Sequence, residues 1–138
     1  MARIIALDYG TKRVGIAVTD PSQIIAGGLT TVRTNELFHF LEEYLRNEIV
    51  ESLVIGYPKK MNNKDSELLK YIMQFESGFL KRFPKIPVIR VDERFSSSLA
   101  IDAMIRGGMK KKNRQVKGNI DKISAAIILQ SYLDQIKR

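Results

Sequence analysis

The stretch RIIALDYGTKRVGIAVT, residues 3–19, decides the fold of this chain. It consists of two apolar, β-rich runs, Arg3 to Asp8 and Val14 to Thr19, on either side of a short turn that contains Gly10. Two such runs around a glycine turn predict an antiparallel β-hairpin. A third β-rich run, from about Gly28 to Arg33, extends the hairpin into a three-stranded meander.

After the meander, helical and strand-like spacing of the apolar residues alternate along the chain. The first helix has Asn35 as its expected N-cap, since asparagine favours that position. The segments are, in order, a helix after Asn35, a strand at 52–56, a helix that begins at Asp65 or Ser66, a strand at 88–91, a helix at 96–106 ended by Gly107-Gly108, and a helix that begins near Asn119. One face of the second of these helices should be apolar, because helical spacing relates Leu68, Ile72, Phe75, Phe79 and Phe83.

This order of elements, βββαβαβα with a further helix, predicts an α/β fold. Strands that are separated by helices should lie parallel through right-handed crossovers. The expected architecture is RNase H-like: a mixed five-stranded sheet with helices on both faces. The chain has 138 residues, of which 44% are hydrophobic and 28% charged. These values are typical of one globular domain, so we expect residues 1–138 to form a single domain.

Three acidic residues are expected at one edge of this sheet. Asp8 ends the first strand, Glu93 follows the last strand, and Asp121 lies in the first turn of the last helix. Carboxyl ends of parallel strands meet at one edge, where α/β sheets bind ligands. Gathered carboxylates need a compensating cation, and Mg²⁺ or Mn²⁺ accepts such oxygen ligands. We therefore predict that Asp8, Glu93 and Asp121 are catalytic residues that bind two metal ions for phosphodiester hydrolysis by water.

Each acid also has a simpler interpretation. Asp8 could be an ordinary turn residue, and Glu93 could pair only with Arg94. Asp121 would stabilise a helix N-terminus with or without a metal. Asp20 and Asp92 remain alternatives to the trio. The only histidine, His39, has apolar neighbours in a helix, which favours a structural role over a general base.

Basic residues give the chain a formal net charge of +8, which indicates an acidic partner such as nucleic acid. A basic run between residues 106 and 117 contains no acid and leads into the helix that contains Asp121. A solvated charge run is the alternative. No aromatic residue interrupts this run, which favours structured nucleic acid over single strands. The predicted binding residues are Lys12, Arg13, Arg94, Lys110, Lys111, Lys112, Arg114 and Lys117.

Cysteine is absent from the chain, which excludes disulfide bonds and thiolate zinc sites. No apolar run approaches the roughly 20 residues that a membrane-spanning helix needs. We therefore expect a cytoplasmic protein without a membrane partner.

Four motifs give the chain a family resemblance. Residues 8–20, DYGTKRVGIAVTD, resemble the opening motif of the YqgF family, the Holliday-junction-resolvase-like ribosomal RNA nucleases of bacteria. Residues 56–58, 92–97 and 121–130 are similar to its later elements, with Tyr57 in place of leucine. The resemblance implies an RNase H-like fold, catalytic residues at Asp8, Glu93 and Asp121, and a role in maturing the 5′ end of pre-16S ribosomal RNA, with the assembling small subunit as partner.

Three other functions are also considered for this sequence. A branched-DNA resolvase would use the same chemistry, and two coordinated cuts would favour a homodimer over a monomer. A non-catalytic assembly factor would bind ribosomal RNA without cutting it. The turn after Asp8 also resembles the phosphate-binding turn of the actin and sugar-kinase superfamily, but one domain cannot form the two-domain cleft that binds ATP.

Overall fold

The structure is a computed structural model that describes residues 2–57, 63–92 and 117–136. The helix predicted at residues 96–106 and the basic run that precedes Lys117 lie outside these ranges.

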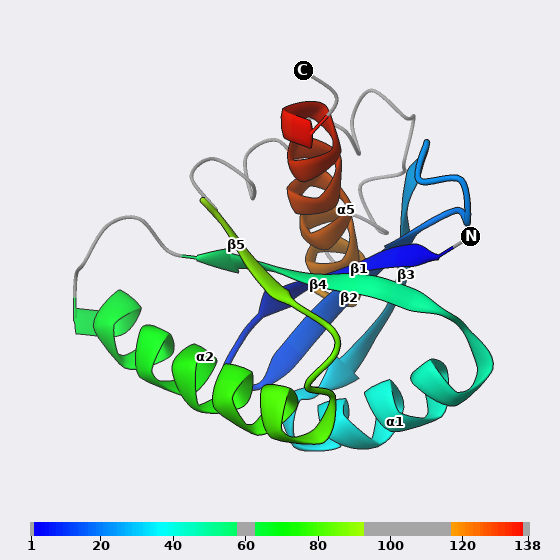
Figure 1. Ribbon diagram of the computed structural model, residues 1–138. Helices are drawn as coiled ribbons and strands as arrows, with labels where there is room; N and C mark the ends of the chain where they lie inside the picture. The colour runs from blue at the N-terminus through cyan, green and yellow to red at the C-terminus, as the bar shows by residue number, and fades with distance from the viewer. Residues whose placement is uncertain (1, 58–62, 93–116, 137–138) are drawn as a thin grey trace.

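Five strands form one mixed sheet, as predicted, and their order in it is β3-β2-β1-β4-β5 (Figure 1). β1 pairs antiparallel with β2, and β2 pairs antiparallel with β3. β4 lies parallel to β1, and β5 lies parallel to β4. The strands are β1 (Arg3–Tyr9), β2 (Arg13–Thr19), β3 (Ala26–Arg33), β4 (Val50–Tyr57) and β5 (Val88–Asp92).

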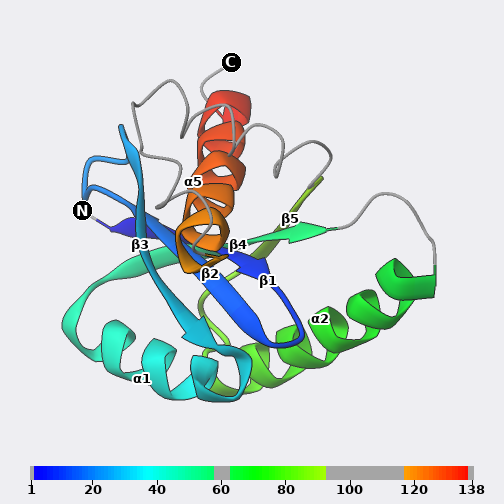
Figure 2. The same cartoon turned by 180° about the vertical axis from the view of Figure 1, so that it is seen from behind.

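Helices cover both faces of the sheet, which confirms the expected layers. Figures 1 and 2 show α1 and α2 on one face and α5 on the other. In the described part of the chain, no helix has the length and apolar composition needed to cross a membrane. The helical elements are the 3₁₀ turn η1 (Thr34–Glu36), α1 (Leu37–Asn47), α2 (Asn63–Arg82) and α5 (Lys117–Ile136).

Alternation along the central strand divides the core into two layers. Ile5 and Leu7 of β1 pack in the layer under α1 and α2. Ile4 and Ala6 pack in the layer under α5. Successive side chains of a strand point to opposite faces, so an apolar run without polar interruption is the pattern of a strand covered on both sides.

An aromatic row on α2 forms much of the first layer. Phe79 is 1% exposed and lies between two other rings of the same helix face. Its ring centroid is 5.9 Å from that of Phe75 and 5.0 Å from that of Phe83. Such tilted pairs add to the stabilisation that burial of the rings supplies. The helical spacing of these residues therefore predicted the buried face of α2 correctly.

Helix starts are where the sequence-based expectations were wrong. Asn35 does not cap α1, because it lies inside η1, and Glu36 occupies the N-cap position without a side-chain hydrogen bond. The chain leaves β3 through this 3₁₀ turn, whose Thr34 amide donates to the Lys12 carbonyl at 3.0 Å. α2 begins at Asn63 and α5 at Lys117, each about two residues before the expected start. Propensity alone does not define the ends of a helix more closely than about two residues.

Candidate active site

Asp8 lies at the carboxyl end of the central strand, on the face that α5 covers. Its neighbours Leu7 and Tyr9 point into the opposite layer, under α1 and α2. The two-residue period of β1 therefore places the half-buried Asp8 on the same face as Ile4 and Ala6. The end of β1 expected to bind a ligand thus presents a carboxylate toward the α5 side.

Glycines flank Asp8 on both adjacent strands. Gly15 of β2 is its direct partner in the ladder. Gly56 of β4 lies one residue beyond Ile55, which pairs with Leu7. Both glycines occupy α5-face positions, so the two residues level with Asp8 on the neighbouring strands have no side chain. A carboxylate with such neighbours suits a hydrated cation, which needs room for its waters as well as an oxygen ligand. The glycines are in the motifs quoted above, but only the register reveals what they do.

The other two predicted acids are placed only in part. Asp121 belongs to α5, on the same face as Asp8, and the adjacent Lys122 main chain lies against β3. A Cβ atom built on Gly28 would be 3.1 Å from the Lys122 carbonyl oxygen, so the absence of a side chain at Gly28 lets α5 pack closely on β3 there. Glu93 lies outside the described residues and directly follows β5. Val91 of β5 pairs with Gly56, at the same edge as Asp8. The described side chains include no group of three metal-binding acids, and the trio stays a prediction.

Asp20, the first alternative acid, has a structural role. It ends β2, which runs antiparallel to β1, so it lies at the edge opposite to Asp8. Its Oδ1 accepts hydrogen bonds from the backbone amides of Ile24 and Ile25, both at 2.8 Å. The amide hydrogen bond from Ile25 is the largest of the effects that lower the pKa of Asp20. Asp20 therefore shapes the β2–β3 loop.

His39 and Asp92 are the two remaining candidates for a functional role. The His39 side chain is 77% exposed on α1, and its Nε2 lies 3.3 Å from Glu43 Oε1. His39 is thus exposed on α1, beside Glu43 and on the face of the sheet opposite to Asp8. Asp92 is the last residue of β5 and pairs with Tyr57 in the ladder.

Tyr57 belongs to a polar cluster with Glu76 and Arg90 on the opposite face of the sheet. The Tyr57 hydroxyl donates a hydrogen bond to Glu76 Oε1 of α2, and Arg90 Nη2 donates to the same oxygen at 3.2 Å. The Arg90 guanidinium lies 4.7 Å from the centre of the Tyr57 ring. Burial, and then the bond to Glu76, raise the pKa of the Tyr57 hydroxyl. Tyr57 and Arg90 therefore tie β4 and β5 to α2 through Glu76.

Cationic residues gather beside the Asp8 end of the sheet. Lys12 lies in the β1–β2 turn, Arg13 is the first residue of β2, and Arg33 ends β3 beside them. Arg33 is not among the predicted binding residues, because only its ladder pairing with Arg13 brings it to this end of the sheet. Lys117 begins α5, whereas the other predicted binding residues lie outside the described ranges: Arg94, Lys110, Lys111, Lys112 and Arg114.

The Gly10 turn should not tolerate a side chain. A Cβ atom at Gly10 would lie 2.6 Å from the Arg13 carbonyl oxygen, a backbone atom that cannot move alone. We expect Gly10→Ala to lower the free energy of unfolding by about 1–3 kcal/mol, the usual range for such overpacking. Urea denaturation measures the difference. Gly27→Ala is the matched control, because a Cβ atom there meets nothing within 4 Å. Equal stabilities of the two variants would show that the turn adapts freely.

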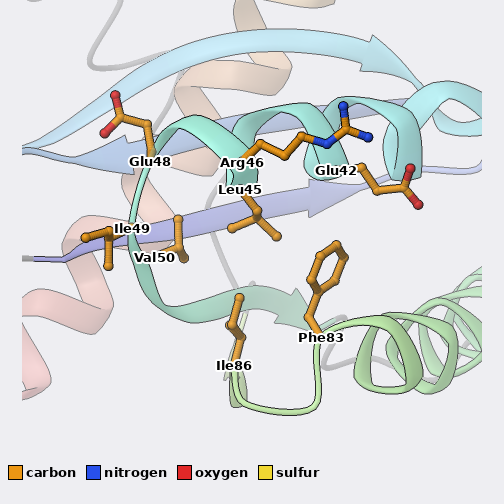
Figure 3. A pocket seen from close by; sticks show the side chains of 8 residues that line it. All are labelled: Glu42, Leu45, Arg46, Glu48, Ile49, Val50, Phe83 and Ile86. Carbon is orange, nitrogen blue, oxygen red and sulfur yellow. The ribbon is translucent and has the colours of Figure 1, made fainter.

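The apolar hollow in Figure 3 lies away from this edge. It lies where the end of α1, the start of β4 and the segment after α2 meet. Leu45, Phe83 and Ile86 face one another across it, while the charged group of Arg46 points away (Figure 3). Its acids are engaged elsewhere: Glu42 pairs with Arg82 and Glu48 pairs with Arg3. The hollow thus has neither the carboxylates nor the position of the predicted site.

A sheet of this order, with a carboxylate at the end of its central strand and cations beside it, defines the RNase H-like class of α/β domains. Within that class the chain belongs to the RuvX family, described as "Holliday junction resolvase", whose match spans residues 2–135. This membership confirms the family resemblance and places the chain among nucleases, which are hydrolases of phosphodiester bonds. Nucleases of this resolvase class generally use divalent metal.

Relatives are similar over nearly the whole chain. A protein of Christiangramia forsetii is 55% identical over 133 residues, which are 96% of this chain and 98% of the relative. A protein of Phocaeicola vulgatus is 55% identical over 137 residues, or 99% of each chain. Both are named "Putative pre-16S rRNA nuclease".

Two solved structures share the fold at low sequence identity. RuvC of T. thermophilus, in complex with a Holliday junction substrate, has a TM-score of 0.61 and 14% identity and covers 99% of this chain and 96% of its own. The fowlpox virus resolvase, bound to Holliday junction DNA, has a TM-score of 0.59 and 15% identity, with 99% of each chain covered. At these identities the likeness shows the fold alone, and it confirms the expected RNase H-like architecture.

Proposed function

We propose that this chain is a metal-dependent endonuclease that processes the 5′ end of pre-16S ribosomal RNA in the cytoplasm. One observation supports the chemistry above all: Asp8 lies at the carboxyl end of the central strand with glycine beside it on both neighbouring strands. The names of the relatives support the choice of substrate. The assembling small ribosomal subunit is the proposed partner.

Asp8, Glu93 and Asp121 would hold two divalent ions, Mg²⁺ or Mn²⁺. When bound, such ions activate water and stabilise the leaving oxygen of an in-line phosphoryl displacement. Asp8 lies on the central strand, so its position is fixed by ladder hydrogen bonds to strands on both sides. Such support holds a ligand in place more rigidly than a loop does. Lys12 and Arg13 would bind backbone phosphates and orient the strand that is cut.

The experiment offers two labelled substrates, pre-16S ribosomal RNA and a four-way DNA junction, each with Mg²⁺, Mn²⁺ or EDTA. We expect cutting of the RNA near its 5′ end with metal and none with EDTA. Salt-sensitive RNA binding without cutting under any condition would instead indicate a non-catalytic assembly factor.

The family description supports a second candidate, a branched-DNA resolvase. Metal-dependent cutting of the junction alone would favour it. Two coordinated cuts across a junction need a two-fold dimer. Sedimentation with junction DNA therefore gives an independent check, since a monomer throughout would contradict a resolvase.

A further inference from the structure

We propose that Lys12, Arg13 and Arg33 form a pocket for a backbone phosphate that flanks the phosphate to be cut. The inference adds Arg33 to the binding residues and rests on the proposed function for its choice of nucleic acid. The ligand chemistry is a phosphodiester of a nucleic-acid backbone, read without regard to base.

The pocket is built from the ends of three elements that meet beside the β1–β2 turn. The Thr34 hydroxyl donates to the Gly10 carbonyl at 2.7 Å, and the Thr34 amide donates to the Lys12 carbonyl at 3.0 Å. These bonds tie the turn to η1 and so fix the main chain of Lys12 relative to the end of β3. The described residues that line the pocket are Thr11, Lys12, Arg13, Arg33, Thr34 and Asn35.

Like charges face each other in this pocket. Arg13 and Arg33 are direct partners in the antiparallel β2–β3 ladder. Like charges directly opposite each other on adjacent strands destabilise a sheet. Among the described residues that line the pocket, none is acidic. Lys12 and Arg33 make no ion pair with any residue in the described ranges. A bound anion would offset the positive charge that Lys12 and Arg33 bring to the pocket.

Phosphate matches the donors that the pocket offers. An arginine guanidinium binds two phosphate oxygens at once, and lysine adds a point charge. Thr11 and Asn35 at the pocket wall have hydroxyl and amide groups of the kind that contact phosphate oxygens in nucleic-acid complexes. A small neutral ligand would leave the charges of Lys12 and Arg33 without a counter-ion among the described residues.

The position relative to Asp8 indicates which phosphate binds. Arg13 lies two residues before Gly15, the ladder partner of Asp8, and on the same face of the sheet. Strand geometry places the Arg13 main chain about 7 Å from that partner along β2, and β3 lies about 10 Å from β1. The pocket therefore lies beside the site of Asp8 rather than over it. A strand with its scissile phosphate at Asp8 would place a neighbouring phosphate between Arg13 and Arg33.

Binding of a pre-16S ribosomal RNA fragment tests the pocket, with EDTA present and Asp8→Asn as the background, so that no RNA is cut. We expect Arg33→Gln to weaken binding about 10-fold, the effect of one charged phosphate contact. The slope of log K against log salt should become shallower by about 1. An unrelated RNA of equal length should lose the same factor. Arg46→Gln is the matched control, because Arg46 is an exposed arginine in the last turn of α1.

Stability separates this role from a structural one. Arg33→Gln should unfold at the same or a higher urea concentration, since it removes a like-charge contact, and Arg33→Lys should keep the salt slope. Binding and salt slope equal to those of Arg46→Gln would overturn the pocket. If the wild type does not cut RNA and Arg33→Gln still weakens RNA binding, the nuclease is refuted and the pocket is supported. Normal cutting by the wild type together with a neutral Arg33→Gln would refute the pocket alone.

Discussion

Asp8→Asn should abolish metal-dependent cutting while the protein stays folded. The substitution keeps the size of the side chain but removes the negative charge that a divalent ion requires. The ions supply several kcal/mol of transition-state stabilisation, so the rate should fall by about 1,000-fold or more. Single-turnover cutting of pre-16S ribosomal RNA measures the change. Glu93→Gln and Asp121→Asn should have effects of the same order.

Asp20→Asn is the control for the loss of one carboxylate charge from the protein. Asp20 also follows a strand, yet its carboxylate accepts amide hydrogen bonds in the β2–β3 loop at the opposite edge. Its replacement should leave the cutting rate unchanged. Melting temperatures with and without Mn²⁺ supply a second readout, because a bound ion stabilises the folded state. The metal-induced shift should disappear in Asp8→Asn and persist in Asp20→Asn. Wild-type cutting by Asp8→Asn would remove this residue from the mechanism.

Phe79→Ala should be the most destabilising single truncation in the aromatic row of α2. Its ring is 1% exposed and packs against Phe75 and Phe83. Removal of a buried phenylalanine ring costs about 3–5 kcal/mol, because transfer energy is lost and a cavity remains. That is a large share of the roughly 5–15 kcal/mol by which a typical protein is stable. The free energy of unfolding in urea measures the loss.

Leu80→Ala is the matched control on the same helix. Leu80 follows Phe79 directly, but its side chain points outward and the residue is 41% exposed. Its truncation should change the free energy of unfolding by less than about 1 kcal/mol, as is usual for surface positions. If Leu80→Ala lowered the free energy of unfolding as much as Phe79→Ala does, the burial pattern of α2 would be wrong.

Local patterns explain why much of the fold was predictable. The Gly10 turn between two apolar runs predicted the hairpin, which the pairing of Asp8 with Gly15 confirms. The helical spacing of Phe75, Phe79 and Phe83 predicted the buried face of α2. These signals depend on neighbours a few residues apart, so they can be read without knowledge of the sheet. The Asn35 cap failed for the opposite reason, since the exit from β3 is shaped by a bond to Lys12.

The roles of Asp8 and Asp20 differ because of tertiary structure. By sequence both are acids at the ends of β-rich runs. The antiparallel direction of β2 places them at opposite edges, so only Asp8 lies where parallel strands end. The pairing of Arg13 with Arg33 and the glycines beside Asp8 likewise depend on register between distant segments.

By itself the sequence determined the strand and helix pattern, the acid at the end of the first strand and the excess of positive charge, because these are properties of the chain read in order. Only the tertiary structure decided that Asp8 and Asp20 lie at opposite edges of the sheet, that Arg33 pairs with Arg13 and that glycines lie on both sides of Asp8. Strand direction and register bring together residues far apart in the chain, and a shift of one residue would turn every side chain of a strand to the other face.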